Sequence, residues 1–206
     1  MHKIRIIGMG PGSQDYLLPI AKKEIENADC LVGAKRLLLL FTRLKKEKIY
    51  LEGHFKDAVL YLKKNRARKR IVVLVSGDPG LYSFLEQVKK NLKRQSYEVI
   101  PGISSLQVAF AKIGESWNDA KIISVHGRTL GDLARQVNAS PKVFLLTDSR
   151  FPPCRIASYL LDSGTGNRRA IVFENLTYPQ ERIVDTDFKR LSKMKDFGLC
   201  AMIIKK

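Results

Sequence analysis

Short apolar runs alternate along this chain with stretches in which apolar residues recur every three or four positions. The first pattern is typical of buried strands and the second of amphipathic helices. The clearest run is 71–75, where four of five apolar residues are β-branched, so we expect both of its faces to be buried, as in a parallel sheet. In the first half the pattern predicts strands at 4–7, 30–32, 71–75 and 97–100, and helices at 17–28, 35–44, 55–62, 82–92 and 104–113.

The second half begins with the same alternation and then changes. The pattern predicts strands at 122–125, 143–146, 170–173, 181–184 and 199–204, and helices at 130–137, 152–161 and 188–191. Alternating strands and helices indicate an α/β fold with mainly parallel pairing in the first half. Consecutive strands near the C-terminus favour a mixed sheet there. We expect two domains, 1–113 and 119–206, with the boundary between them.

Composition narrows the class of protein. A length of 206 residues with 45% hydrophobic and 28% charged residues is ordinary for a folded chain with a sizeable core. Cys30, Cys154 and Cys200 are too few and too scattered for a disulfide framework, and no CxxC pair or histidine cluster indicates a metal site. The longest apolar stretch, 37–41, falls far short of the roughly 18 residues that suggest a membrane span. We therefore expect a cytoplasmic protein with no metal site and no membrane partner.

The charge balance is strongly basic. Lys and Arg number 37 against 20 Asp and Glu, which gives a formal net charge of +17. Such an excess suits nucleic acid, an acidic membrane surface, an acidic small substrate or simply a solvated surface. Much of it lies in two runs, 35–48 and 63–70, which lack the interleaved aromatic residues of nucleic-acid binders. We interpret the runs as solvated helix faces, and a basic non-enzymatic RNA-binding protein remains the alternative from another class.

The breaks after predicted strands carry the candidate chemistry, because ligands of open α/β sheets bind at the carboxyl ends of strands. The break 8–12 reads Gly-Met-Gly-Pro-Gly. It fails the dinucleotide fingerprint, since Ser13 stands where the third glycine would fall and Pro11 removes a backbone donor. A tight turn and a ligand loop are equally open interpretations there.

Three later breaks hold polar side chains. The carboxylate of Asp78 could accept from an amine or a ribose hydroxyl, or it could cap the next helix. Ser104 could cap the helix that follows it, whose open N–H groups could also meet a carboxylate. His126 and Arg128 place an imidazole and a guanidinium just past a strand, where Arg suits a carboxylate partner, although a surface or packed histidine is the alternative.

These loops, in this order, resemble the tetrapyrrole (corrin/porphyrin) methylases, which use S-adenosylmethionine. Segment 6–12 is similar to the opening segment of that family, 75–79 to its SGDP loop and 99–105 to its PGxSS segment. Within the family, 28–37 and 117–128 resemble the CbiE type, which methylates C(5) of cobalt-precorrin-7 or precorrin-6Y. Asn118 departs from that type, where an acidic residue is common.

The resemblance implies a two-domain α/β methylase of cobalamin biosynthesis with its cofactor between the domains and S-adenosylhomocysteine as product. The cofactor residues that it implies are Met9, Gly77, Asp78, Leu81, Ser104, Ser105, Leu146, Asn175 and Leu176. An anionic tetrapyrrole would contact Gly10, Pro11, Gly12, His126 and Arg128, with His126 as candidate proton acceptor.

The resemblance also implies partners. Members of this family are usually homodimers, and some carry a second methyltransferase that decarboxylates and methylates at C(15). We expect this chain to act only at C(5), with a separate C(15) enzyme as a partner and no nucleic acid. Another precorrin methylase or an rRNA methylase of the same family is the alternative.

Overall fold

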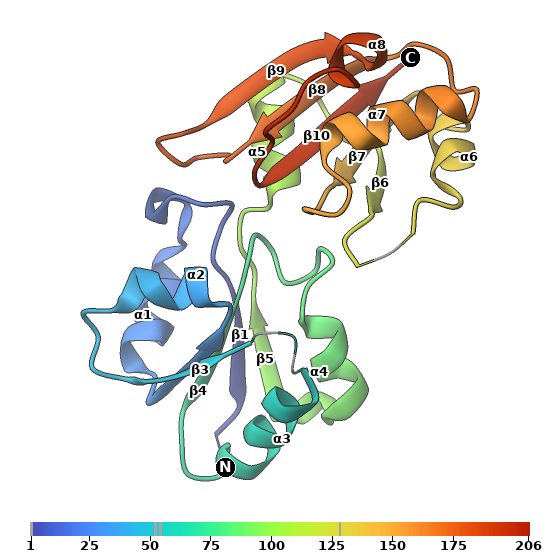
Figure 1. Ribbon diagram of the computed structural model, residues 1–206. Helices are drawn as coiled ribbons and strands as arrows, with labels where there is room; N and C mark the ends of the chain where they lie inside the picture. Colours follow the sequence, from blue (N-terminus) through green and yellow to red (C-terminus); the bar gives the residue numbers. More distant parts are fainter. Residues whose placement is uncertain (1, 52, 54, 128) are drawn as a thin grey trace. The chain divides into compact units, whose positions relative to one another are not determined.

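The computed structural model describes residues 2–51, 53, 55–127 and 129–206. Contacts divide the chain into two compact units, Met1–Ser104 and Ser105–Lys206 (Figure 1). The expected boundary lay at 113–119, after helix α5 (Ser105–Ile113), whereas this division falls before that helix. Helix α5 belongs to the second unit because its Phe110 is fully buried, with its ring centroid 6.3 Å from that of Phe144 in the second sheet.

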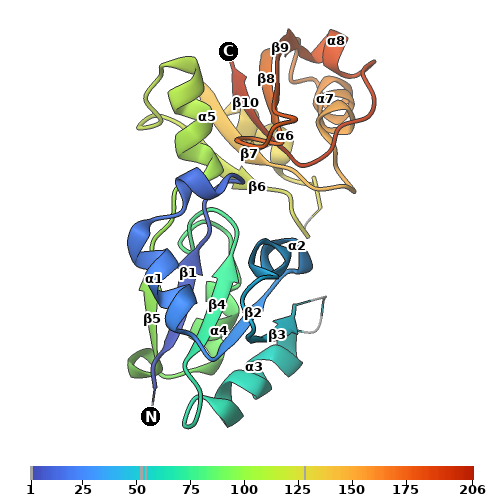
Figure 2. The ribbon, with the colours of Figure 1, turned by 90° about the vertical axis from the view of Figure 1, so that its left-hand side faces the viewer.

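The first unit is built on a five-stranded sheet in the order β3-β2-β4-β1-β5, in which each pair of neighbouring strands is parallel. The strands are β1 (Ile4–Gly8), β2 (Cys30–Gly33), β3 (Glu47–Tyr50), β4 (Ile71–Val75) and β5 (Tyr97–Ile100). β4 lies at the centre with every residue buried, as its run of β-branched residues predicts (Figure 2). The pattern did not predict β3, an edge strand with exposed ends.

Helices cover both faces of this sheet. They are α1 (Pro19–Asn27), α2 (Lys35–Leu38), α3 (Phe55–Asn65) and α4 (Leu85–Asn91), with short 3-10 turns at Gln14–Tyr16, Leu39–Phe41 and Arg94–Ser96. Successive residues of a strand point to opposite faces. Val73 therefore packs with Leu62 of α3, while its neighbour Leu74 packs with Ile25 of α1, and each face has its own hydrophobic core.

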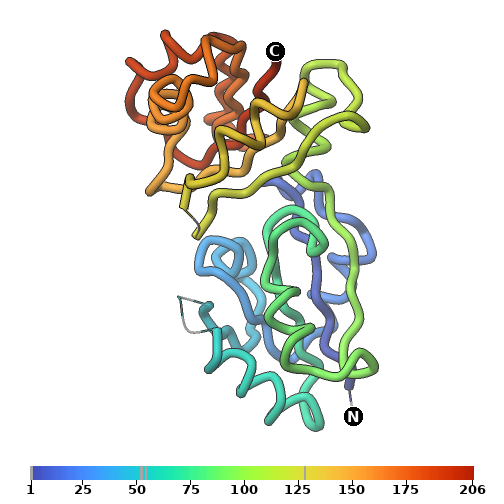
Figure 3. Tube along the Cα trace, turned by 90° about the vertical axis from the view of Figure 1, so that its right-hand side faces the viewer, coloured from blue at the N-terminus to red at the C-terminus, as the bar shows by residue number. Residues whose placement is uncertain are grey.

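The second unit carries a mixed sheet in the order β6-β7-β10-β8-β9. Its strands are β6 (Lys121–Ser124), β7 (Lys142–Leu146), β8 (Arg169–Glu174), β9 (Arg182–Asp187) and β10 (Cys200–Lys205), and its other helices are α6 (Leu133–Asn138), α7 (Pro153–Asp162) and α8 (Phe188–Leu191). β6 and β7 are parallel, and β10 pairs antiparallel with both β7 and β8. The colours of Figure 3 follow the path of the chain through this unit, from green to red at the C-terminus. The predicted α/β class, with a parallel first sheet and a mixed second one, is confirmed.

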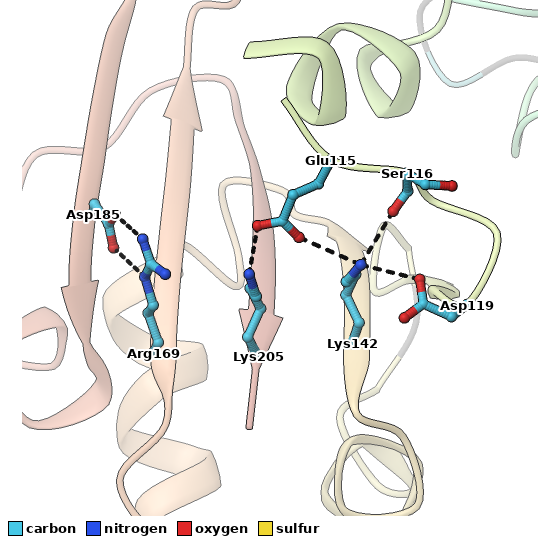
Figure 4. Close-up of polar contacts among 7 residues, drawn as sticks. All are labelled: Glu115, Ser116, Asp119, Lys142, Arg169, Asp185 and Lys205. Carbon is cyan, nitrogen blue, oxygen red and sulfur yellow. Dashed lines mark hydrogen bonds and ion pairs between the residues drawn. The ribbon is translucent and has the colours of Figure 1, made fainter. Parts of the chain in front are cut away.

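Ion pairs connect the segment that follows α5 to strands β7 and β10 (Figure 4). Lys142 Nζ lies 3.0 Å from Asp119 Oδ1 and 3.4 Å from Glu115 Oε2, and its side chain is only 14% exposed. Lys205 pairs with the other oxygen of Glu115. The hydrogen bond from Lys205 outweighs desolvation and holds the pKa of Glu115 below its ordinary value.

The described residues, 2–51, 53, 55–127 and 129–206, lack two further features. No helix in that part of the chain has both the length and the apolar character that crossing a membrane requires. The same residues contain no group of three or more His, Cys, Asp or Glu side chains placed to hold a metal ion.

Candidate functional site

Three neighbouring loops of the first unit bring together the residues that its sequence motifs singled out. β4, β1 and β5 are adjacent and parallel, with Gly8 opposite Val75 and Ile7 opposite Ile100. Their carboxyl ends therefore meet at one edge of the sheet. The predicted residues of these loops are Met9, Gly10, Pro11 and Gly12 after β1, Gly77, Asp78 and Leu81 after β4, and Ser104 after β5.

Glycines allow these loops to touch through their backbones. Gly77 donates its N–H to Gly10 O at 2.8 Å and accepts from Gly10 N–H at 3.3 Å, and both residues have positive φ, +62° and +76°. Only glycine adopts such values without strain. A Cβ added to Gly8 would lie 2.5 Å from Gly77 O and 2.6 Å from the backbone of Gly102. Any larger residue at Gly8 would therefore push the three loops apart.

The carboxylate of Asp78 ties two of the loops together. Its Oδ1 accepts from the N–H of Gly80 at 2.7 Å, and its Oδ2 accepts from the N–H of Gly102 at 2.9 Å. It does not cap α4, which begins only at Leu85. An ionised carboxylate has about four acceptor positions, so this half-buried group can still accept from a ligand.

The remaining predicted residues of the first unit differ in how far their side chains are buried. The Met9 side chain is 3% exposed and packs in the core on the α1 side of the sheet, so a ligand at this position would meet the backbone first. Ser104 is also buried, whereas Leu81 and Pro11 are half-buried. The edge thus offers backbone groups, one carboxylate and limited apolar surface.

The other predicted residues belong to the second unit, and most of them lie along one edge of its sheet. β6, β7 and β8 run in the same direction, because β10 is antiparallel to both β7 and β8. Ser124 lies opposite Leu146, Leu146 opposite Ala201, and Cys200 opposite Glu174. The loops that carry His126, Asn175 and Leu176 therefore follow strand ends along this edge, and Ser105 begins α5 of the same unit.

His126 stands on a turn that Asp148 organises. Its side chain is 76% exposed, and its Nδ1 lies 3.7 Å from Asp148 Oδ2, too far for a hydrogen bond. Asp148 accepts from the N–H groups of Gly127 at 3.1 Å and Phe151 at 2.8 Å. Burial alone raises the pKa of Asp148, but these backbone donors outweigh it and hold the pKa below its ordinary value. Arg128, the other predicted residue of this turn, lies outside the described residues.

The end of β8 adopts a constrained backbone. Asn175 has a positive φ of +49° and donates its N–H to Leu199 O at 2.9 Å, while the side chain of Leu176 is buried. Glu174, just before them, is 7% exposed and accepts from Arg182 Nε at 2.7 Å. These bonds position the predicted pair at the sheet edge. Asp148 and Glu174 were not among the predicted site residues, although each follows a predicted strand and lies in a segment that fits the family resemblance.

Comparisons with known proteins agree on one family. The model of the family Tetrapyrrole (Corrin/Porphyrin) Methylases matches residues 3–192. A protein of Methanocaldococcus jannaschii named "Probable cobalt-precorrin-7 C(5)-methyltransferase" is 36% identical over 195 residues, which cover 92% of this chain and 91% of that protein. The "Cobalt-precorrin-7 C(5)-methyltransferase" of Salmonella typhimurium is 36% identical over 180 residues, 87% of this chain and 88% of that protein.

A solved structure shares the fold. The uroporphyrin-III C-methyl transferase of Thermus thermophilus, crystallised with S-adenosyl homocysteine, has a TM-score of 0.79 at 21% identity. The match covers 98% of this chain and 92% of that chain.

Proposed function

Because this chain belongs to the family of tetrapyrrole (corrin/porphyrin) methylases, we propose that it transfers a methyl group from S-adenosylmethionine to C(5) of cobalt-precorrin-7 in cobalamin biosynthesis. The observation that carries this proposal is the identity of 36% with two proteins named for that activity, over most of each chain. The agreement is not confined to one motif.

The residues at the two sheet edges have the chemistry that the cofactor needs. Ligand sites are mostly apolar and contain a few placed polar groups. Here Leu81 and Leu146 are half-buried, and Asp78 and Ser105 add a carboxylate and a hydroxyl. We assign to the cofactor the set Met9, Gly77, Asp78, Leu81, Ser104, Ser105, Leu146, Asn175 and Leu176.

The protein's part in this reaction is to position the reactants. S-adenosylmethionine supplies an activated methyl group on its sulfonium. Aligning two reactants and excluding water can lower a barrier by several kcal/mol, so no strongly activated side chain is required. Asp78 contributes by fixing the β4 and β5 loops through Gly80 and Gly102.

We assign the proton that the methylated macrocycle releases to His126. Its imidazole is exposed, and the carboxylate of Asp148, 3.7 Å from Nδ1, would stabilise the cation that forms when the imidazole takes up this proton. Gly10, Pro11, Gly12 and Arg128 complete the proposed substrate contacts.

Turnover with a defined substrate tests the proposal. The protein is incubated with cobalt-precorrin-7 and S-adenosylmethionine, and the product is examined by mass spectrometry. We expect the mass gain of one methyl group together with release of S-adenosylhomocysteine. A control without cofactor should show neither. Methylation of uroporphyrinogen III in preference to cobalt-precorrin-7 would assign the chain to a different step.

The assembly is a separate proposal. We propose a homodimer in the cytoplasm, with a separate enzyme acting at C(15). Light scattering on the purified protein measures the mass directly. A mass of one chain at micromolar concentration would contradict the dimer, and binding to RNA would contradict the absence of a nucleic-acid partner.

A further inference from the structure

A small cavity opens at the carboxyl edge of the first sheet. Its volume is about 190 Å³, and its walls come from β4 and from the segments that follow β2, β3 and β4. The residues that line it include Ala34, Leu37, Leu51, Phe55, Tyr82 and Phe84. Ser76 lines it as well and directly precedes Gly77 and Asp78. The cavity thus adjoins the β4 loop while sharing no lining residue with the set assigned to the cofactor.

Aromatic rings form one wall of the cavity. Phe55 and Phe84 stack with their ring centroids 5.5 Å apart and their planes 27° from parallel. Phe55 is 47% exposed and Tyr82 44% exposed, so part of each side chain is accessible from solvent. Exposed aromatic faces suit a flat conjugated ligand, against which they can stack.

The backbone at Tyr82 is strained. Its φ is +46°, a left-handed value that is a genuine outlier for a bulky residue. Hydrogen bonds on both sides hold the loop, from Leu81 N–H to Asp78 O at 3.1 Å and from Leu85 N–H to Ser83 Oγ at 3.1 Å. Strain of this kind persists where the surroundings over-determine it, and it clusters at ligand sites. The fold therefore keeps an aromatic residue where glycine would fit with less strain.

A cationic side chain contacts the lining of the cavity. The guanidinium of Arg36 donates to the hydroxyl of Ser76, which is a lining residue. Arg36 and its neighbour Lys35 are both exposed. A guanidinium has five N–H donors in a planar fork, so Arg36 retains donors that fit a carboxylate.

We propose that this cavity is a subsite for one edge of the tetrapyrrole substrate. The rings of Tyr82 and Phe55 contact a pyrrole of the macrocycle, and the guanidinium of Arg36 pairs with one of its carboxylates. Pockets that enclose a whole ligand measure about 300–1,000 Å³, so a cavity of about 190 Å³ fits one edge of the macrocycle and leaves the rest outside. This inference rests on the proposed function, because the substrate class comes from there.

Binding of uroporphyrin III, a tetrapyrrole with carboxylate side chains, tests the subsite without turnover. Kd is measured by absorbance titration for the wild type, Arg36→Gln and Tyr82→Gly. The matched control is Arg68→Gln, which removes the same charge from an exposed position before β4, at the opposite edge of the sheet. We expect Kd to rise roughly tenfold in Arg36→Gln, as the loss of one hydrogen-bonded ion pair predicts, and to stay unchanged in Arg68→Gln.

Tyr82→Gly separates a binding role from a structural one. Because glycine relieves the positive φ, we expect its Tm to be equal to or above that of the wild type while Kd rises severalfold. Arg36→Lys, which keeps the charge but loses the fork, should fall between wild type and Arg36→Gln.

Measurements of turnover distinguish a failure of the subsite from a failure of the proposed C(5) methylation. The KM for cobalt-precorrin-7 should rise in Arg36→Gln and Tyr82→Gly. Equal Kd and KM in wild type, Arg36→Gln and Tyr82→Gly would overturn the subsite even if C(5) is methylated. Tetrapyrrole binding through the cavity without methylation at C(5) would overturn the proposed function and leave the subsite standing.

Discussion

Removing the Asp78 carboxylate perturbs the contact that holds the β4 and β5 loops together. In Asp78→Ala, the N–H groups of Gly80 and Gly102 lose their acceptor at 2.7 and 2.9 Å. A hydrogen bond to a charged group contributes about 1.5–3 kcal/mol. Because Asp78 is half-buried, water recovers part of this, so we expect a loss of about 1 kcal/mol per bond and about 2 kcal/mol in total.

Thermal unfolding measures this loss. For a chain of this size, 1 kcal/mol lowers Tm by about 2–4 °C, so Asp78→Ala should unfold about 4–8 °C below the wild type. Asp78→Asn keeps one oxygen acceptor and should lose about half as much. Calorimetric titration with S-adenosylhomocysteine should show weaker binding in both variants, because the loops that carry the proposed contacts are no longer joined.

Asp132→Ala is the matched control. Asp132 is 51% exposed and pairs with Arg135 three residues along the chain, an arrangement that contributes about 0–1 kcal/mol. If Asp78→Ala and Asp132→Ala unfold at the same temperature, Asp78 does not join the loops and the reasoning is wrong.

Gly102, His126 and Glu115 give three further tests. A Cβ on Gly102 would lie 2.7 Å from the backbone of Gly8, so Gly102→Ala should lower Tm and abolish binding of S-adenosylhomocysteine in the same titration. His126→Ala should lower kcat by about 10²-fold without changing that affinity, and an unchanged kcat would remove His126 from proton transfer. The pKa of the Glu115 carboxyl is lower in the folded chain than in the unfolded chain, because Lys205 donates a hydrogen bond to it. Its ionised form therefore stabilises the fold at pH values above the unfolded-state pKa, and this stabilisation is lost as pH falls through the folded-state pKa. The difference in urea midpoint between wild type and Lys205→Gln should be clear at neutral pH and vanish in strong acid.

The local pattern of hydrophobic residues predicts correctly those strands that are buried along their whole length. β4 is apolar at every position and buried at every position, so its sequence alone predicts a central parallel strand. β3 was missed because Glu47–Tyr50 is an edge strand with exposed ends, and its polar composition resembles the loop before it. The helix expected from residue 82 begins only at Leu85, because the positive φ of Tyr82 interrupts it.

The loops of the candidate site were predictable, but the contacts between them were not. Strand ends and glycines are visible in sequence, and adjacent parallel strands then bring Gly8, Gly77 and Gly102 together. That Asp78 would accept from Gly102, or Asp148 from Gly127, depends on strand order and register, which no local window contains. The basic residues near 35–48 were interpreted as a solvated helix face, yet Arg36 borders the cavity beside β4.

The position of the new methyl group is the most direct test of the proposed activity. Cobalt-precorrin-7 is converted with S-adenosylmethionine that carries a ¹³C label in its methyl group, and the product is examined by NMR. We predict a single enriched methyl resonance that couples to C(5) of the macrocycle. An enriched methyl on any other carbon, or no enrichment of the tetrapyrrole, would contradict the account.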